Sequence, residues 1–338
     1  MNSERIQSFL QGVPMPAMMI EGGTSILACN DLAFGLFGEG IQGRNPAVAV
    51  RAPAVHAAIE EIARMGGVQQ VRMTLRREGQ EDVFEVTVSS QGGGLVLCVF
   101  RDVSEEEKIG AMRRDFVANV SHELRTPLTA LMGFIETLKH AAKDDPKARE
   151  MFLGIMETEA GRMNRLVRDL LQLSQVEANE RIRPRDQVEV RGLLERVIGS
   201  LRGVAEKTGD RVDLTGDPVM VPGDHDQLVQ VFTNLIENAL KYGAAGQVVR
   251  VSLTPEETVR GPAVRVEVAD QGEGIDPVHL PRLTERFYRV DSHRSREMGG
   301  TGLGLAIVKH IIGRHRGWLR VESVVGEGSR FSVVLPLG

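Results

Sequence analysis

The stretch VANVSHELRTPLTALMGF, residues 117–134, carries side chains that could transfer a phosphoryl group. On a helix with 100° per residue, His122 lies about 160° from the apolar residues two positions to either side, so its ring is expected to face solvent. A neutral imidazole is a good nucleophile toward phosphorus, and the adjacent carboxylate of Glu123 can orient or deprotonate it. Thr126 projects from nearly the same face. A lone histidine would be assigned to the surface, but this combination favours a phosphate acceptor.

Two long amphipathic segments are expected to position that histidine. From about 105 to 140, apolar residues recur three and four positions apart, and Pro127 should bend this helix locally. Ser104 can cap its start, where the acidic triplet EEE favours the helix dipole. A second segment, Phe152 to Val176, repeats apolar residues nearly in heptads. Two such helices bury too little surface alone, so a hairpin that pairs with a second copy in a four-helix bundle is predicted.

A second set of polar residues lies on the predicted helix DQLVQVFTNLIENALKYG, which Asp224 caps with Gln227 in the capping-box position. Asn234, Asn238 and Lys241 fall on one side of this helix. An amide oxygen can ligate Mg²⁺, and a lysine can bind phosphate. Ordinary surface polarity explains two asparagines about equally well, so this helix alone does not define a site.

Two glycine-containing segments could complete a nucleotide site. The strand VEVADQGEGI leads into Asp270 and a turn where the backbone can approach a flat ligand closely. The segment GGTGLGLAIVKHI opens a helix with unhindered N–H groups and a positive dipole for phosphates. It is not a Walker loop, since no Lys-Ser/Thr follows, and not a dinucleotide fingerprint, since no strand precedes it. Its glycines are Gly299, Gly300, Gly302 and Gly304.

The string FVANVSHELRTPL resembles the phosphoacceptor box of sensor histidine kinases. The later segments, in this order and with ERFYRVD as the F box, resemble the N, G1, F and G2 boxes of that family's ATP-binding domain. The resemblance implies ATP and Mg²⁺, with His122 as the phosphorylated nucleophile and Glu123 as its general base or orienting partner. It implies that Thr126 positions a water molecule for dephosphorylation of a response regulator.

The resemblance also assigns the nucleotide contacts. Asn234 would bind Mg²⁺ and phosphates, with Asn238 beside it, and Asp270 would accept a hydrogen bond from the adenine amino group. Gln271 stands where the family usually has asparagine, which departs from the pattern at that turn alone. The other implied residues are Lys241 and Arg289 at the phosphates, Tyr242 beside the nucleotide, and Gly272, Gly274, Gly300, Thr301, Gly302, Leu303 and Gly304 along the lid and pocket.

The implied function is autophosphorylation of His122 from ATP, transfer of the phosphoryl group to an aspartate of a separate response regulator, and phosphatase activity toward that regulator. The implied assembly is a homodimer. An ATP hydrolase of the gyrase or chaperone type is one alternative, although those proteins place a water-activating carboxylate where Asn234 stands. A catalytically inactive, ligand-sensing scaffold is another, and the presence of His122, Asn234 and Asp270 argues against it.

The fold class predicted for the whole chain is multidomain α+β. Residues 1–104 mix short strands with a helix at AVHAAIEEIARM and resemble a PAS sensor domain. Residues 105–181 are expected to form the antiparallel dimerising hairpin, and the resemblance implies that residues 187–338 form an α/β two-layer sandwich of the Bergerat ATP-binding type. The segments GRNPAVAVRAPAVHAAIEEI and LTALMGFIETLKHAAKDD resemble the phosphate-regulon sensor kinases in particular.

Composition limits the partners and the location. The chain has 41 Lys and Arg against 46 Asp and Glu, so bulk charge does not support a nucleic-acid partner. Cys29 and Cys98 lie in apolar runs, which indicates core residues in a reducing compartment. No apolar run approaches the roughly 20 residues of a membrane span. A cytoplasmic chain is expected, either a soluble member or a part of a protein whose relatives commonly carry an N-terminal membrane segment.

Overall fold

The computed structural model describes residues 3–77, 79–140, 143, 145–180, 182–291 and 300–338. The chain forms two compact units, Met1–Ala118 and Asn119–Gly338. Gly299 of the glycine-rich segment lies outside the described residues. None of the described helices is both long enough and apolar enough to cross a membrane.

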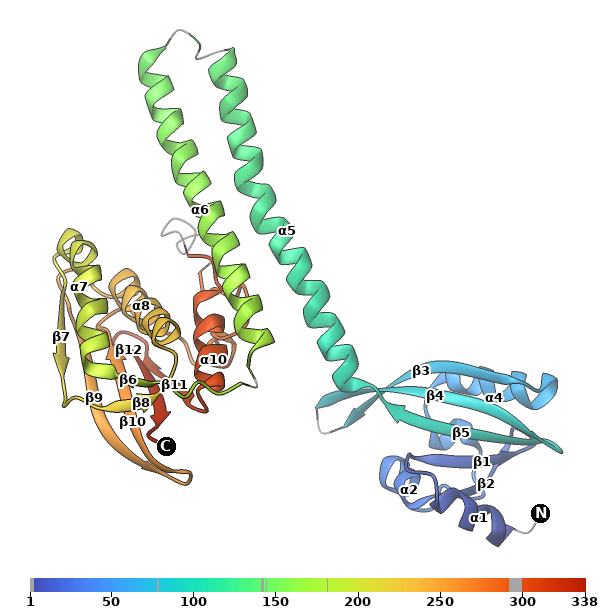
Figure 1. Ribbon diagram of the computed structural model, residues 1–338. Helices are drawn as coiled ribbons and strands as arrows, with labels where there is room; N and C mark the ends of the chain where they lie inside the picture. The colour runs from blue at the N-terminus through green and yellow to red at the C-terminus, as the bar shows by residue number, and fades with distance from the viewer. Residues whose placement is uncertain (1–2, 78, 141–142, 144, 181, 292–299) are drawn as a thin grey trace. The chain divides into compact units, whose positions relative to one another are not determined.

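The N-terminal unit is an antiparallel sheet whose strands pair in the order β2-β1-β5-β4-β3 (Figure 1). The chain thus returns from its last strand to pair with its first. The elements are α1 (Ser3–Gln11), β1 (Ala17–Glu21), β2 (Ser25–Cys29), α2 (Asp31–Phe37), α3 (Pro46–Ala49), α4 (Pro53–Met65), β3 (Val68–Arg77), β4 (Gln80–Gly92) and β5 (Leu95–Asp102).

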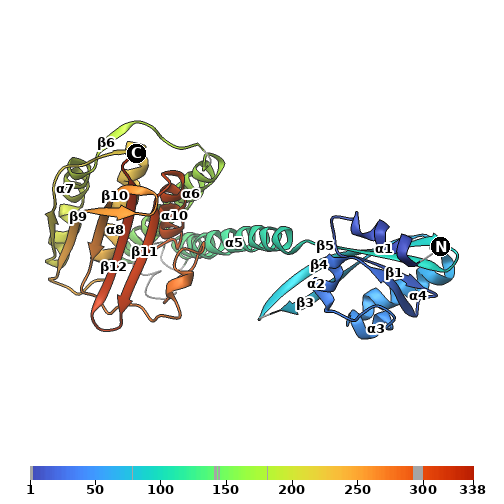
Figure 2. The same ribbon diagram turned by 90° about the horizontal axis from the view of Figure 1, so that it is seen from below.

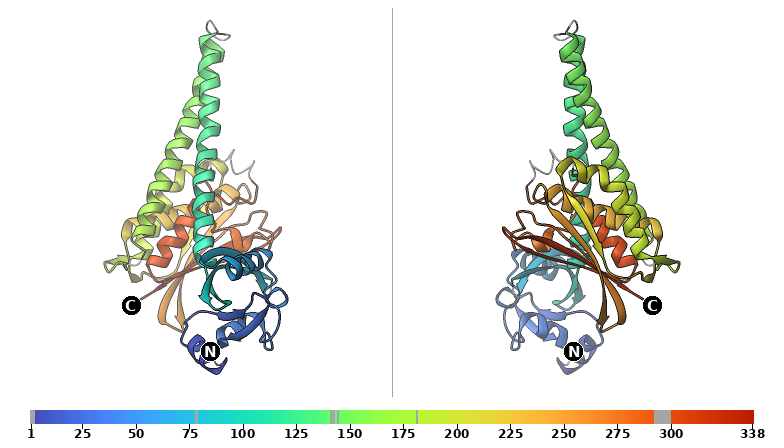
Figure 3. Two further views of the ribbon diagram at one scale, coloured as in Figure 1. Left: turned by 90° about the vertical axis from the view of Figure 1, so that its right-hand side faces the viewer. Right: turned by 90° about the vertical axis from the view of Figure 1, so that its left-hand side faces the viewer.

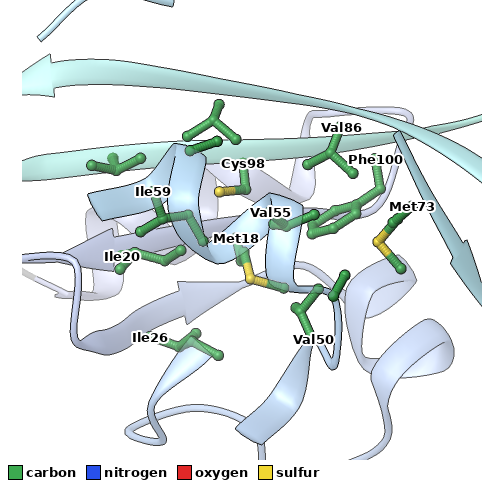
Figure 4. Close-up of a cluster of buried hydrophobic side chains, with 14 of the residues drawn as sticks. Met18, Ile20, Ile26, Val50, Val55, Ile59, Met73, Val86, Cys98 and Phe100 are labelled. Carbon is green, nitrogen blue, oxygen red and sulfur yellow. The ribbon is translucent and has the colours of Figure 1, made fainter. Parts of the chain in front are cut away.

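Alternation along the central strands builds the core of this unit. On β5, Val96, Cys98 and Phe100 are buried, and the residues between them are half-buried on the opposite face. The buried face packs against Val55 and Ile59 of α4, as Figure 4 shows. The predicted burial of both cysteines is confirmed, and burial raises the pKa of the Cys98 thiol to about 12.

A buried asparagine ties the first helix of this unit to the sheet. Asn30 is 1% exposed, and its Oδ1 accepts hydrogen bonds from the N–H groups of Ala17 and Ala33, each at 3.0 Å. Its Nδ2 donates to the carbonyl oxygen of Leu10 in the last turn of α1 and to those of Val13 and Met15 in the segment that follows, the nearest being Met15 at 2.7 Å. One side chain therefore satisfies backbone groups from three segments and also caps α2.

Replacing Asn30 by alanine is expected to destabilise the N-terminal unit by about 3 kcal/mol, because several buried backbone groups lose their partners together. In a thermal unfolding experiment on the full chain, far-UV circular dichroism should show that part of the secondary structure is lost at a lower temperature than in the wild type. Trp318, the single tryptophan, lies in the other unit, so the unfolding midpoint followed by its fluorescence should equal that of the wild type. Asn45→Ala, which removes one exposed helix cap, is the matched control. Equal effects of the two substitutions would contradict this account of Asn30.

The strand β5 passes almost directly into the helix α5 (Ser104–Lys139). Ser104 was expected to cap this helix, but it is the first helical residue, and its Oγ accepts from the N–H of Val83 at 2.8 Å. Asp102, two residues before the helix, supplies the partner of the first helical N–H group, since its Oδ1 accepts from the N–H of Ser104 at 2.9 Å. Hydrogen bonding to Ser104 lowers the pKa of this carboxyl group.

The second unit begins within α5, at Asn119, and the rest of this helix forms a hairpin with α6 (Pro146–Ala178), visible in both views of Figure 3. The rings of Phe134 and Phe152 stack with their centroids 5.3 Å apart, and further along, Arg162 forms an ion pair with Glu123. Residue numbers rise on one helix as they fall on the other, so the helices are antiparallel, as predicted. Large apolar side chains remain exposed along both helices: Leu128, Met132, Ile135, Met151, Leu153, Ile155, Val167 and Leu171.

The rest of this unit is a two-layer domain in which helices cover one face of a sheet (Figure 2). The strands pair in the order β11-β12-β10-β9-β7, with β7 and β9 parallel and the others antiparallel. The elements are β6 (Gln187–Glu189), α7 (Val190–Thr208), β7 (Arg211–Thr215), β8 (Met220–Pro222), α8 (His225–Tyr242), β9 (Val248–Thr258), β10 (Gly261–Ala269), η1 (Leu280–Arg282), α10 (Gly304–Arg314), β11 (Trp318–Val324) and β12 (Gly328–Pro336).

The strand pattern read from the sequence is present in the sheet. Val264, Val266 and Val268 of β10 are buried and lie opposite Leu335, Val333 and Phe331 of β12. The helix α8 packs on this face with β9, β10, α7 and α10. At this edge of the sheet, the turn after β10 lies beside the end of α8, since a Cβ atom at Gly272 would lie 2.4 Å from the carbonyl oxygen of Tyr242.

Candidate nucleotide and phosphotransfer site

A cavity of about 980 Å³ lies at that edge, bounded by α8, the turn after β10, the segment before α10, and α6. Its volume lies within the range of small-molecule sites in proteins. The helix α8 contributes Asn234, Asn238, Lys241 and Tyr242 to its lining. The first three, which the sequence placed on one side of this helix, do face one space.

The start of α8 is fixed by two side chains. Oδ1 of Asp224 accepts from the N–H of Gln227 at 3.2 Å, which confirms the predicted cap. The reciprocal half of the predicted capping box is wrong: the N–H of Asp224 donates to Nε2 of His315, at 2.9 Å, and not to Gln227. Burial lowers the pKa of His315, which keeps this ring neutral and able to accept that hydrogen bond. No local pattern marks this partner, because it lies 91 positions away along the chain.

Asp270 closes the cavity at the end of β10. Its Oδ1 accepts from the N–H groups of Gly272, at 2.9 Å, and Ser329, at 3.2 Å. Among the described residues, no hydrogen bond is made by Oδ2, so this atom can serve a ligand. Burial raises the pKa of the Asp270 carboxyl group, and the two backbone hydrogen bonds act in the opposite direction. Gly272 is required here because a Cβ atom would lie 2.4 Å from the carbonyl oxygen of Tyr242.

The glycine-rich segment lets the backbone approach its neighbours closely. Gly302 has a φ angle of +72°, and a Cβ atom there would lie 2.9 Å from Cα of Phe287. At Gly304, the first residue of α10, a Cβ atom would lie 3.0 Å from Oδ1 of Asn234. The N-terminus of α10 and the amide of Asn234 therefore lie side by side, and the helix N–H groups favour an anion there.

Arg289 connects this cavity with the hairpin. It lines the cavity, its side chain is only 7% exposed, and its Nη2 donates to Oε2 of Glu123 at 3.2 Å. Its Nε is buried and has no hydrogen-bond partner among the described residues. An unpaired guanidinium N–H is costly in a protein interior, and an anionic oxygen in the cavity would satisfy it.

His122 is exposed on α5, as predicted, and it is not among the residues that line the cavity. Its neighbour Glu123 is half-buried and is held by Arg162 of α6 as well as by Arg289. Oγ1 of Thr126 donates to the carbonyl oxygen of His122 at 3.2 Å. The histidine is therefore linked to the cavity through Glu123. Pro127, about one turn further along α5, is a buried residue within the helix.

Comparison with known proteins identifies both parts of this unit. Residues 112–179 match the His Kinase A (phospho-acceptor) domain, and residues 223–338 match the histidine kinase-, DNA gyrase B-, and HSP90-like ATPase family. The phosphate regulon sensor protein PhoR of Pseudomonas aeruginosa is 43% identical over 70% of this chain and 53% of its own length. The sensor protein kinase WalK of Staphylococcus aureus is 37% identical over 71% of this chain and 57% of its own length.

The chain belongs to the sensor histidine kinases. It spans about half the length of these curated relatives. A solved structure of the histidine kinase ThkA in complex with the response regulator protein TrrA covers 98% of both chains at 20% identity, with a TM-score of 0.51, and supports the fold. The predicted fold class, a mixed α+β chain with a helical phosphoacceptor region and a C-terminal α/β sandwich, is thereby confirmed.

The sensor kinase cavity has one wall that the sequence analysis missed. The helix α6 supplies Asp169 and Gln172: Oδ2 of Asp169 accepts from Oγ1 of Thr301 at 2.7 Å, and Oε1 of Gln172 accepts from Gln230 at 2.6 Å. Burial raises the pKa of Asp169. Both residues lie on α6 among apolar residues of the seam, and no sequence motif marked them.

Most of the predicted nucleotide residues of this sensor kinase line one cavity, and a few do not. Gly272 and Leu303 are buried and are not among its lining residues. The residues predicted to be catalytic, His122, Glu123 and Thr126, lie on α5. Ser329 and Phe331 of β12 line the cavity without having been predicted. The predicted residues along the lining are Asn234, Asn238, Lys241, Tyr242, Asp270, Gly274, Arg289, Gly300, Thr301, Gly302 and Gly304.

Proposed function

We propose that this chain binds ATP with Mg²⁺, autophosphorylates on His122, and passes the phosphoryl group to an aspartate of a response regulator. The observation that carries the proposal is the double role of Arg289. This residue lines the cavity with a buried, unpaired Nε and also holds Glu123, the neighbour of the exposed His122. An anion drawn to Arg289 would thus be bound beside the proposed nucleophile, which is the arrangement that phosphoryl transfer needs.

Within the proposed site, each end of ATP has suitable partners. Asp270 would accept the adenine amino group through Oδ2, while its Oδ1 remains on the backbone. The N-terminus of α10, together with Lys241 and Arg289, would surround the phosphates. Lys241 now pairs with Glu237 at 3.0 Å, so its ammonium group would have to leave that carboxylate to reach a phosphate.

The residues at the phosphate end fit Mg²⁺ carried by the nucleotide. Asn234 would supply an amide oxygen, with Asn238 beside it, and the ion would offset negative charge on the phosphates. Among the described residues, no group of three or more His, Cys, Asp or Glu side chains could hold a metal ion. The amide oxygens of Asn234 and Asn238 suit an ion whose other ligands are phosphates and water, because Mg²⁺ commonly keeps several waters in such sites.

In the proposed reaction, the His122 ring attacks the γ-phosphate, a new N–P bond forms, and ADP leaves with the electron pair of the broken P–O bond. Glu123 would orient the ring or accept its proton. Thr126 would position a water molecule when the kinase dephosphorylates its response regulator. Its hydroxyl now donates to the backbone of His122, so it would have to rotate for that task.

We also propose a homodimer in which two hairpins form a four-helix bundle. The exposed apolar side chains along α5 and α6 support this assembly, because a single hairpin leaves them in water. We propose the domain limits 1–104, 105–181 and 187–338, with a PAS-like sensor module first. The antiparallel sheet of the N-terminal unit, packed on α4, is compatible with that module.

Incubation of the full chain with Mg²⁺ and γ-labelled ATP tests the proposal. Acid-labile, alkali-stable label on the protein is expected, with none from α-labelled ATP and none after chelation of Mg²⁺. Release of free phosphate without protein label would favour the gyrase-like hydrolase instead. ATP binding with neither reaction would favour the inactive scaffold. Transfer is then followed by adding purified receiver domains one at a time.

A further inference from the structure

A buried glutamine links two walls of the nucleotide cavity. Gln247 directly precedes β9 and is 4% exposed. Its Oε1 accepts from the N–H of Gln271 at 2.7 Å, and its Nε2 donates to the carbonyl oxygen of Ala239 at 2.8 Å. Gln271 directly follows Asp270, and Ala239 lies in the last turn of α8. One side-chain amide therefore connects the turn after β10 to the end of α8.

The backbone of Gln247 gives this amide a fixed starting point. The N–H of Gln247 donates to Oδ1 of Asp210 at 3.1 Å, and its carbonyl oxygen accepts from the N–H of Arg211, the first residue of β7, at 3.0 Å. Oδ2 of Asp210 in turn accepts from Oγ1 of Thr208 at 2.5 Å. Because rotation of the buried side chain would break the bonds at both ends of its amide, Gln247 is held in one conformation.

The glycines around this amide bring α8 and the turn into direct contact. A Cβ atom at Gly243 would collide with Nε2 of Gln247, and a Cβ atom at Gly272 would lie 3.1 Å from Cα of Gly243. Gln247 is not among the residues that line the cavity, so it would not touch a bound nucleotide. It joins two walls that do line the cavity, one carrying Asp270 and the other carrying Tyr242.

We propose that Gln247 is a positioning residue that sets the base specificity of the nucleotide site. The inference rests on the proposed function, in which Asp270 accepts a hydrogen bond from the adenine amino group. A hydrogen bond weakens steeply when its geometry departs from the optimum, so α8 must hold the purine at a fixed distance from Oδ2 of Asp270. Gln247 sets this distance, because it joins α8 to the residue after Asp270. Without its amide, the N–H of Gln271 loses its partner and the turn can shift away from α8.

The test compares the affinity of the full chain, with Mg²⁺ present, for ADP and for purine riboside diphosphate, which lacks only the 6-amino group. Neither nucleotide can phosphorylate the protein during titration calorimetry. The wild type is expected to prefer ADP by about 10- to 100-fold, the effect of one hydrogen bond to a charged acceptor. In Gln247→Met, whose side chain has a similar length but no amide, this preference should fall about fivefold or more. Its affinity for the purine analogue should change by no more than about twofold.

A purely structural role of Gln247 predicts a different result. General loosening of the domain would weaken the binding of both nucleotides and leave the preference unchanged. Val197→Ala is the matched control, because it shortens a buried side chain of α7, which contributes no residue to the cavity lining. It should lower the unfolding midpoint and keep the wild-type preference. If Gln247→Met fails to fold, Gln247→Asn replaces it, since an amide one methylene shorter cannot reach both Gln271 and Ala239.

Each result leads to a definite conclusion about Gln247. A wild-type preference for ADP in Gln247→Met, or an equal loss of affinity for both nucleotides, would overturn the inference while leaving the adenine contact of Asp270 intact. No preference in the wild type would overturn both that contact and the role of Gln247, so the wild type is measured first. Absence of histidine label from ATP would overturn the kinase function alone, because this comparison measures binding.

Discussion

A chain with glutamine in place of His122 is expected to bind ATP normally and to incorporate no acid-labile phosphate. The glutamine amide has no nucleophilic lone pair comparable to that of imidazole, so labelling should fall by more than about 1,000-fold. His122 is exposed and contacts Thr126 only through its backbone oxygen, which glutamine retains. Stability should therefore change by no more than about 0.5 kcal/mol.

His140→Gln is the matched control for this experiment. His140 is also an exposed histidine of the hairpin, just beyond the end of α5, and its replacement should leave labelling unchanged. Label that persists in His122→Gln, or that disappears in His140→Gln alone, would show that the phosphate acceptor has been assigned to the wrong residue. Binding of a fluorescent ATP analogue, measured in parallel, confirms that each variant still holds nucleotide.

Asp270→Asn is expected to lose ATP affinity by about 30-fold or more while the domain stays folded. Asparagine can keep its Oδ1 on the N–H groups of Gly272 and Ser329, which places its NH₂ group toward the adenine amino group, so two donors face each other. A hydrogen bond to a buried charged acceptor contributes about 1.5–3 kcal/mol, and the variant also gains a repulsive contact. Titration calorimetry measures the loss, and guanine nucleotides should lose less than ATP because guanine presents a carbonyl oxygen there.

The titration of Asp270 should make both the stability of the chain and its affinity for ATP depend on pH, in opposite directions. Burial raises the folded-state pKa of Asp270, so the folded chain binds this proton more tightly than the unfolded chain does. The contribution of Asp270 to stability is therefore greatest at low pH and falls as pH rises through the raised pKa. ATP affinity should change in the opposite direction, since the adenine contact needs the carboxylate, and it should weaken as pH falls.

Asp270→Asn should remove both of these pH dependences. At pH 7 its unfolding midpoint, followed by Trp318 fluorescence, should equal or exceed that of the wild type, because a buried charge is removed. Wild-type ATP affinity in this variant, or an unchanged dependence of affinity on pH, would mean that Asp270 does not contact the base. A large drop in the unfolding midpoint would show that its carboxylate is needed for the turn itself.

The local pattern of apolar and polar residues was sufficient to predict where several helices and strands lie and which residue caps α8. Alternation of apolar residues located β10 and β12, periodicity located α5 and α6, and Asp224 does cap α8. Spacing on one helix also predicted correctly that Asn234 and Asn238 would face one space. These features depend on residues within a few positions of one another, where the period of a helix or strand fixes the geometry.

Predictions failed where a partner came from a distant segment. Gln227 was expected to complete the capping box, but His315 accepts that hydrogen bond instead. Ser104 was expected to cap α5, but its hydroxyl oxygen accepts from the N–H of Val83 in β4. Neither competitor is visible in a local window. Such choices are decided by which polar group the packed fold brings nearer.

The sequence by itself determined the residue types that chemistry requires: an outward imidazole with a carboxylate beside it, amides along one helix, and glycines before another. Only the tertiary structure decided how these sets are connected. Arg289 joins the cavity to Glu123, Asp169 and Thr301 bring α6 against the glycine-rich segment, and Arg162 holds the carboxylate from the neighbouring helix. The physical reason is that ion pairs across 39 to 166 positions depend on where whole helices pack, and no periodicity within one segment encodes that distance.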